Sequence, residues 1–201
     1  MAQRDGIFAG DDPFRIAQRW LDEAWLSEPQ DANAAALATV DADGMPDVRI
    51  VLIKAIGEDD FEFFTNYASR KGQQIATSGK AAFNIHWKTL GRQIRVRGSV
   101  SRLSGAASDA YFGSRPLGSR IGAWASRQSE TLKSKATLVR AVQLAEAEHG
   151  DDPVRPEHWG GYVITPYEIE FWAQGEYRLH DRFRWQRKNP TAGWDVNRLN
   201  P

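Results

Sequence analysis

Near its C-terminus the chain carries a dense run of ionisable side chains, Arg178-Leu179-His180-Asp181-Arg182. On an extended strand, Arg178, His180 and Arg182 would project from one face, while Asp181 would face away in a structural role. Three cationic or titratable groups on one face repel one another unless they are solvated, paired with acids or turned toward an anionic ligand. Because histidine titrates near neutral pH, His180 is the candidate for proton handling. The run by itself leaves two interpretations open, a basic surface strand and a site for an anionic substrate.

Two upstream segments place cations where phosphate groups bind well. Arg49 and Lys54 bracket an apolar run, and a strand of that length separates them by roughly 16 Å, so they can serve different anions. In the other segment, Ser69-Arg70-Lys71 stands at a predicted helix start, where free N–H groups and the positive end of the helix dipole attract anions. The alternatives are a strand with solvated ends and a solvated basic turn.

A third polar segment combines Tyr111, Arg115 and Ser119 at four-residue spacing. If the segment is helical, this spacing lets the three side chains converge on one anion. Pro116 requires the helix to break or restart at that point. A surface helix without a ligand is the alternative.

The composition excludes several classes of site. The chain has 201 residues and no cysteine, which excludes disulfides, thiolate catalysis and cysteine-ligated metals. The four histidines are scattered without metal-ligand spacing, so no metal is predicted. There is no phosphate-binding loop ending in Gly-Lys-Ser/Thr and no dinucleotide fingerprint. The 26 basic and 26 acidic residues balance, which argues against nucleic-acid or membrane partners.

The N-terminus also bears on location. Residues 1–12 are polar and show no signal-peptide core, and no stretch reaches the roughly 20 apolar residues that a membrane span needs. The sequence therefore predicts a cytoplasmic protein.

The elements that must position these side chains follow from hydrophobic periodicity and turn residues. We expect helices at 13–24, 68–78, 104–112 and 130–149, the first capped by Asp12. We expect strands at 34–40, 46–55, 61–65, 81–87, 92–103, 161–172, 177–186 and 194–199. This order predicts a mainly β fold with peripheral helices, a barrel in a single domain of residues 1–201. Residues 1–11 are expected to form a flexible arm.

Taken together, these segments resemble the pyridoxamine 5′-phosphate oxidase family of FMN enzymes, from Asp12 to the last residue. The most specific motifs are Phe64 to Gly72, Trp87 followed by Arg92-Gln93, Tyr111 to Pro116 with Gly122 to Ser129, Trp159-Gly160-Gly161-Tyr162, and Glu170 to Trp172 with Arg178 to Arg182.

The resemblance implies a fold, an assembly and a reaction. The fold would be a split β-barrel, and two copies would form a homodimer with FMN in two clefts at the subunit interface. Residues 159–201 would form the dimerisation and active-site region. The enzyme would oxidise pyridoxamine 5′-phosphate and pyridoxine 5′-phosphate to pyridoxal 5′-phosphate in vitamin B6 metabolism, with O2 as acceptor and H2O2 as product.

The resemblance also implies roles for individual residues, some of them from the partner subunit. Arg178 and His180 would be catalytic, over the pyridine ring. The substrate would be held by Lys54, Tyr111, Arg115, Ser119, Arg178, Leu179 and His180. FMN would be held by Arg49, Ile50, Val51, Leu52, Ile53, Lys54, Phe64, Thr65, Arg70, Lys71, Gln93, Gln128, Ser129, Trp172 and Arg182.

The chain departs from the family pattern at Ala173-Gln174, where many members have Gln-Gly, and at Val163, where Arg is common. The rival interpretations are another flavin or deazaflavin oxidoreductase on the same barrel and a flavin-binding module without activity. The presence of Arg178 and His180 together with Tyr111, Arg115 and Ser119 argues against both.

Overall fold

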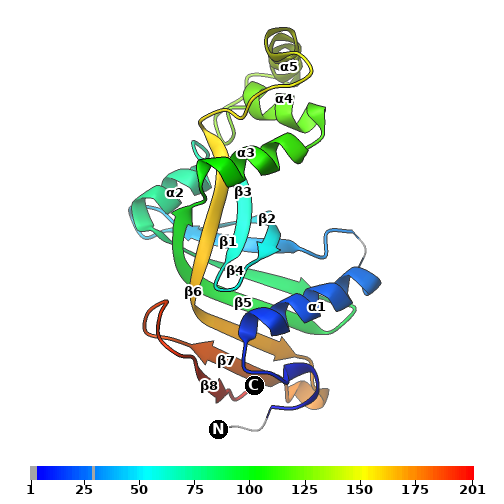
Figure 1. Cartoon of the computed structure of the whole chain (residues 1–201), viewed down its shortest axis with the longest axis vertical. Helices are drawn as coiled ribbons and strands as arrows, with labels where there is room; N and C mark the ends of the chain where they lie inside the picture. Colours follow the sequence, from blue (N-terminus) through cyan, green and yellow to red (C-terminus); the bar gives the residue numbers. More distant parts are fainter. Residues whose placement is uncertain (1–3, 29) are drawn as a thin grey trace.

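The computed structural model describes residues 4–28 and 30–201 (Figure 1). Its helices are η1 (Gly6–Phe8), α1 (Pro13–Ser27), α2 (Arg70–Ser78), α3 (Gly105–Ser114), α4 (Leu117–Ala125), α5 (Lys135–His149) and η2 (Glu176–Arg178). Its strands are β1 (Ala34–Val40), β2 (Pro46–Ile56), β3 (Phe61–Asn66), β4 (Lys80–Trp87), β5 (Arg92–Arg102), β6 (Trp159–Ala173), β7 (Asp181–Gln186) and β8 (Asp195–Arg198).

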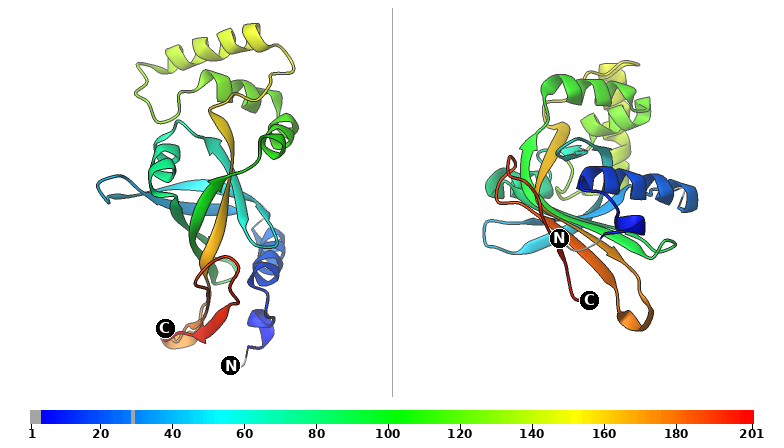
Figure 2. Two further views of the ribbon diagram at one scale, coloured as in Figure 1. Left: turned by 60° about the vertical axis from the view of Figure 1, so that its left-hand side comes forward. Right: turned by 60° about the horizontal axis from the view of Figure 1, so that its bottom comes forward.

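One antiparallel sheet forms the body of the molecule. Its strand order is β3-β2-β1-β4-β5-β6-β7-β8, and β3 also pairs with β6. That extra pairing closes β1 to β6 into a barrel, and β7 and β8 extend the sheet beyond it (Figure 2). In an open sheet the edge strands expose unpaired backbone N–H and C=O groups. Closure of the barrel pairs these groups, so β1 to β6 have no free edge. The predicted split barrel with peripheral helices is confirmed.

Strand β6 connects the two ends of the molecule (Figure 1). Its first residues pair with β3, its middle and end pair with β5, and its last residues pair with β7. A β-bulge lies between Arg97 and Gly98, where β5 shifts register against β6. Gly98 is required there because a Cβ atom would lie 2.2 Å from the carbonyl oxygen of Thr165.

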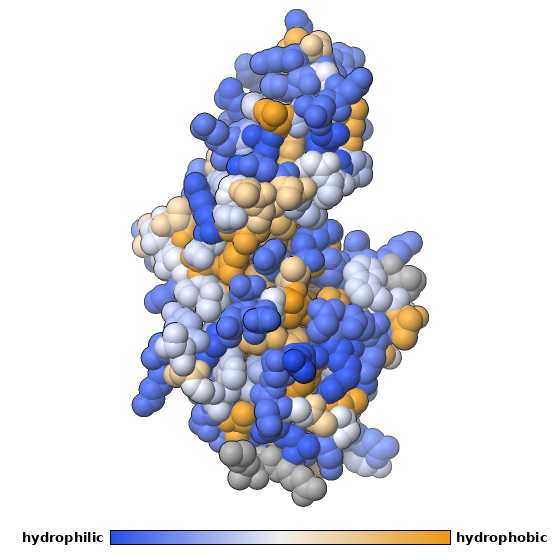
Figure 3. All heavy atoms as spheres, in the orientation of Figure 1, coloured by the Kyte–Doolittle hydropathy of each residue, from blue (hydrophilic) through white to orange (hydrophobic). Residues whose placement is uncertain are grey.

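The helices decorate the barrel at both ends. Helix α1 packs beside the sheet, and the carboxylate of Asp12 caps it by accepting from the amides of Phe14 and Arg15. Helices α3, α4 and α5 gather at the end where β6 begins, away from β7 and β8 (Figures 1 and 2). Apolar side chains gather where α3 meets the barrel (Figure 3).

The core fills the barrel and the space under α1. Aromatic rings dominate it, since Trp20, Phe63, Phe171 and Trp185 are fully buried. Trp20 and Phe171 meet edge to face at 5.1 Å. Burial alternates along β1 and β4, as expected for strands with one face toward a core.

Most predicted elements are confirmed within a few residues, and two are not. The helix expected at 130–149 begins only at Lys135, where Ser134 caps it, and Ala145 is its one buried residue. The strand expected at 177–186 begins at Asp181. The helix that Pro116 had to interrupt ends at Ser114 and restarts as α4 at Leu117.

Part of the expected N-terminal arm, Met1 to Gln3, lies outside the described residues. From residue 4 onward the segment contacts the barrel: Phe8 is buried against Trp20 and Phe183. The indole of Trp185 donates to the carbonyl oxygen of Asp11. The flexibility of the arm and the single-domain division stay predictions.

Candidate functional site

A pocket of about 590 Å³ lies between the barrel and helices α3 and α4. It collects side chains that are far apart in the sequence and that the sequence analysis selected. These are Leu52, Lys54, Phe64, Thr65, Tyr111, Arg115, Ser119 and Gln128. The break between α3 and α4 brings Tyr111, Arg115 and Ser119 to one pocket, with Arg115 in the extended conformation that a residue before proline prefers. We call this the α3/α4 pocket.

Three aromatic rings form one wall of the α3/α4 pocket. Phe64 and Tyr111 stack with ring centroids 3.9 Å apart and an interplanar angle of 23°. Trp159 lies nearly parallel to both rings, at 17° and 6°. The guanidinium of Arg115 lies 4.5 Å from the centroid of the Trp159 ring, within the range of a cation–π contact. Burial lowers the pKa of Arg115.

A second pocket, of about 510 Å³, lies at the N-terminus of α2. It is lined by Asp47, Val48, Arg49, Ile50, Arg70, Lys71, Gln128 and Ser129. We call it the α2 pocket. Ser69 caps the helix: its Oγ accepts from the amide of Gly72 at 3.4 Å and from Nζ of Lys71 at 3.2 Å. Gln128 lines both pockets, so they adjoin.

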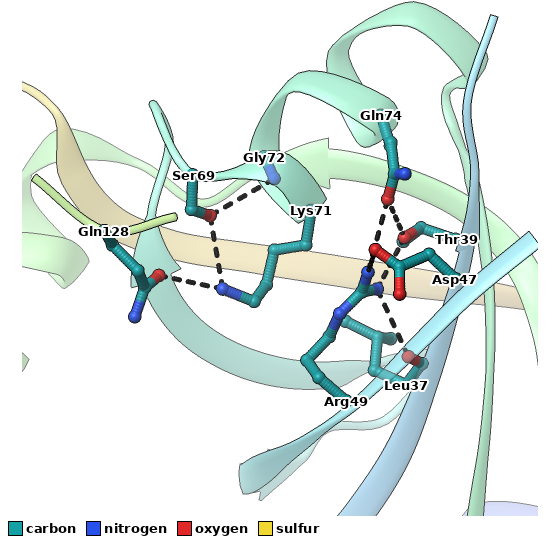
Figure 4. A network of polar contacts seen from close by, with 9 residues as sticks. All are labelled: Leu37, Thr39, Asp47, Arg49, Ser69, Lys71, Gly72, Gln74 and Gln128. Carbon is teal, nitrogen blue, oxygen red and sulfur yellow. Dashed lines mark hydrogen bonds and ion pairs between the residues drawn. The ribbon is translucent and has the colours of Figure 1, made fainter. Parts of the chain in front are cut away.

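Two cations of the α2 pocket, Arg49 and Lys71, are held by neighbouring polar groups (Figure 4). Arg49 forms an ion pair with Asp47 at 2.6 Å and donates to Thr39 and Gln74. Nζ of Lys71 donates to Oε1 of Gln128 at 2.8 Å. Burial, followed by the positive charge of Arg49, lowers the pKa of Lys71 to about 8. A buried ammonium held only by neutral oxygens suits an anionic ligand.

The residues of β2 divide between the two pockets and the core. Leu52 and Lys54 line the α3/α4 pocket, and Arg49 and Ile50 line the α2 pocket. Val51 and Ile53 are buried in the core, so these two residues can offer a ligand only their backbone groups.

The remaining predicted residues lie at the other end of β6. Gln93, Trp172 and Arg182 are neighbours across three strands in the sheet register. Buried Glu170 bridges two cations there, with Arg182 at 2.8 Å and Arg95 at 3.1 Å. His180 lies 4.6 Å from Trp172 between ring centroids.

Arg178 is not on a strand, so the expectation that Arg178, His180 and Arg182 project from one strand face is wrong. Residues 176–178 form the short helix η2, in which Tyr177 has a φ of 53° and Arg178 a φ of 65°. Left-handed backbone at two consecutive non-glycine residues is costly and marks functional segments. Tyr177 and Leu179 are 90% and 71% exposed.

Asp181 pairs with Arg198 at 2.7 Å, which fits the structural role expected for it.

The two groups of predicted residues do not meet within one chain. At about 3.3 Å per residue, an extended strand from Trp159 to Trp172 spans roughly 40 Å. Trp159 of the α3/α4 pocket is the first residue of β6, while Trp172 and its strand partner Arg182 lie near the last; Figure 1 shows β6 running between the two ends of the molecule. A single chain therefore keeps the two groups of predicted residues apart, and we call them half-sites.

Sequence reasoning missed several residues around the pockets. Thr39, Asp47 and Gln74 hold Arg49, and Asn66, Ser126 and Trp159 line the α3/α4 pocket. For Trp159 a signal existed, because the Trp-Gly-Gly motif is distinctive, but no role was assigned to it. Thr39 and Gln74 gave no signal, since only the fold brings β1 and α2 together.

Two classes of feature are absent from residues 4–28 and 30–201. No three His, Cys, Asp or Glu side chains are grouped so that they could hold a metal ion. None of the helices there has the length and apolar character to cross a membrane.

Comparison with known families gives two successive matches along the chain. Residues 21–148 match the model of the family described as pyridoxamine 5′-phosphate oxidase. Residues 159–201 match the model described as the pyridoxine 5′-phosphate oxidase C-terminal dimerisation region.

Individual relatives are similar over nearly the whole chain. A pyridoxine/pyridoxamine 5′-phosphate oxidase of Roseobacter denitrificans is 59% identical over 100% of both chains. One of Cereibacter sphaeroides is 59% identical over 98% of this chain and 99% of its own. Among solved structures, PhzG from Burkholderia lata in complex with tetrahydrophenazine-1-carboxylic acid is 30% identical, with a TM-score of 0.89, over 96% of this chain and 94% of its own.

Proposed function

Because this chain belongs to the pyridoxamine 5′-phosphate oxidase family, we propose that it oxidises pyridoxamine 5′-phosphate and pyridoxine 5′-phosphate to pyridoxal 5′-phosphate. The cofactor is FMN, dioxygen is the acceptor and H2O2 is the second product. The alcohol substrate loses two hydrogens. The amine substrate loses two hydrogens, and water then releases ammonia from the imine. The observation that carries the proposal is that two cationic pockets, the α3/α4 pocket and the α2 pocket, adjoin each other. Two such pockets match two phosphate groups, one on the substrate and one on FMN.

The α2 pocket fits the phosphate of FMN. Its cations, Arg49, Arg70 and Lys71, stand at the N-terminus of α2, whose dipole favours negative charge. Within residues 4–28 and 30–201, the oxygens that accept from Nζ of Lys71 are the neutral ones of Ser69 and Gln128, so its charge is available to a ligand. Ser129 would complete the phosphate contacts. FMN would supply the hydride acceptor and pass electrons on to dioxygen.

The α3/α4 pocket fits the substrate phosphate. A phosphate monoester is close to a dianion at neutral pH, and Lys54 and Arg115 together match that charge. The hydroxyls of Tyr111 and Ser119 add hydrogen bonds. Phe64 and Thr65 line this pocket, and the Thr65 hydroxyl donates to Gln128, which lines both pockets; the flavin chain and ring would pass there.

The residues at the other end of β6 would come from the partner subunit. Arg178 would orient the substrate ring and stabilise developing charge, and His180 would assist substrate binding or proton transfer, with Leu179 between them. Gln93, Trp172 and Arg182 would contact the flavin. This assignment supports a homodimer with two composite sites, in which residues 159–201 serve dimerisation. The cytoplasmic location stays a prediction.

The direct test is turnover by the purified protein reconstituted with FMN. We expect pyridoxine 5′-phosphate to give pyridoxal 5′-phosphate and H2O2 in equal amounts, and pyridoxine without its phosphate to react far more slowly. The matched variant Arg115→Ala should lose activity mainly through a higher KM. A protein that binds FMN but yields no pyridoxal 5′-phosphate would instead support another flavin reaction on this barrel.

A further inference from the structure

Trp159 lines the α3/α4 pocket, and its ring contacts the charged group of Arg115. We propose that Trp159 is a positioning residue: its ring holds the Arg115 guanidinium in place for the substrate phosphate without neutralising its charge, and so strengthens the preference for phosphorylated substrates. The inference rests on the proposed function, because it assigns the α3/α4 pocket to the substrate phosphate.

Arg115 is held by aromatic faces. Its guanidinium carbon lies 4.5 Å from the Trp159 ring centroid and 5.6 Å from that of Phe112. Nη1 of Arg115 is buried and finds no hydrogen-bond acceptor within residues 4–28 and 30–201. A buried donor without a partner is costly, and a phosphate oxygen entering the pocket would satisfy it.

Two other arginines near the barrel are held by carboxylates instead. Arg182 is paired with buried Glu170 at 2.8 Å, and Arg155 with Asp109 at 2.6 Å. A carboxylate fixes a guanidinium but cancels its charge, which weakens attraction for a second anion. An aromatic ring attracts the cation through its quadrupole and leaves the net charge in place. Arg115 therefore combines a defined position with an uncompensated charge.

Trp159 is itself rigidly placed. It pairs with Asn66 at the junction of β3 and β6, and its carbonyl oxygen accepts from Nη1 of Arg155 at 2.6 Å. The next two positions must be glycine: a Cβ on Gly160 would lie 2.2 Å from the Tyr67 hydroxyl, and one on Gly161 would lie 2.9 Å from the Phe64 ring. The Trp-Gly-Gly motif thus lets Trp159 lie parallel to Phe64 and Tyr111.

The test compares Trp159→Leu, which removes the π face, with Trp159→Phe, which keeps one. For Trp159→Leu we expect the KM for pyridoxine 5′-phosphate to rise about tenfold, with kcat and FMN affinity changed less than about twofold. Trp159→Phe should recover most of the loss. Trp124→Leu is the matched control, because Trp124 lies on α4 and its indole donates to the carbonyl oxygen of Val154; its KM should stay at the wild-type value.

Two further measurements separate positioning from general damage. In an Arg115→Ala background, Trp159→Leu should raise KM no further, since the residue acts through Arg115. Calorimetric titration of the FMN-loaded protein with inorganic phosphate, which needs no turnover, should show about tenfold weaker binding in Trp159→Leu. A full additional loss in the Arg115→Ala background, or unchanged phosphate binding, would overturn the inference even if the wild type oxidises its substrate. An inactive wild type would overturn the proposed function instead.

Discussion

At the scale of single residues, three of the five cations that line the two pockets differ in what holds them. Arg49 is paired with Asp47, Lys71 is held by neutral oxygens, and Arg115 lies against aromatic rings. A cation without an acidic partner keeps its attraction for a ligand phosphate. The residue contacts therefore indicate that Lys71 and Arg115 contribute more to anion binding than Arg49 does.

The proposed contact of Lys71 with the FMN phosphate predicts that FMN binding depends on pH. Its pKa of about 8 means that the ammonium is charged below pH 8 and loses its proton above it. The FMN phosphate is already ionised in this range, since its second pKa is about 6. The Kd for FMN should therefore rise roughly tenfold between pH 7 and pH 9. Quenching of flavin fluorescence during titration of the apoprotein measures this Kd.

Lys71→Arg is the matched control for this pH dependence, because arginine stays charged throughout the range. Its Kd should vary little from pH 7 to pH 9. An equal rise in the variant and the wild type would place the titrating group elsewhere.

At the scale of elements, strands with one buried face were predictable and the segment before β7 was not. Burial alternates along β1 and β4, and the expected bounds of β1 match the structure. Residues 177–180 alternate between apolar and polar side chains, which is typical of a strand. Tyr177 and Arg178 nevertheless adopt positive φ values, which cannot be predicted from these residue types. Leu132 and Val139 contributed to the amphipathic pattern that predicted a helix at 130–149, but both are exposed, and Leu132 lies before α5 begins.

The bulge at Gly98 gives a test at this scale. Gly98→Ala would force a Cβ to within 2.2 Å of a backbone oxygen in β6. We expect the free energy of unfolding to fall by about 2–3 kcal/mol, measured by urea denaturation. Gly105→Ala is the control, because a Cβ there meets no atom within 4 Å; its effect should stay within about 0.5 kcal/mol. Equal stabilities of the two variants would contradict the assigned strand register.

At the scale of the whole molecule, the two half-sites lie at opposite ends of β6, so a single chain cannot assemble the proposed site. Met45, Val48 and Ile50 are each more than 60% exposed beside the α2 pocket. Residues of this kind are typical of a surface that a second copy covers. The sequence motifs identified residues of both half-sites. They did not predict the distance between the two half-sites, because that distance depends on the path of β6 through the fold.

Complementation between two impaired variants, assayed at a substrate concentration far below the raised KM of Arg115→Ala, tests the composite site. Arg178→Leu should lower turnover far more than FMN affinity, and Arg115→Ala should leave the other half-site nearly inactive at that concentration. If each site combines halves from two chains, a hybrid dimer of these variants has one intact site. With random pairing, coexpressed chains should regain about a quarter of wild-type activity. A mixture no more active than its parents would place each site within one chain.

The most direct test of the whole account is the absorption spectrum of the purified protein. The protein should be yellow with bound FMN, and its flavin absorption should bleach when pyridoxine 5′-phosphate is added without oxygen and return when air is admitted. A colourless protein that takes up no FMN, or bound flavin that stays oxidised under excess pyridoxine 5′-phosphate, would contradict it.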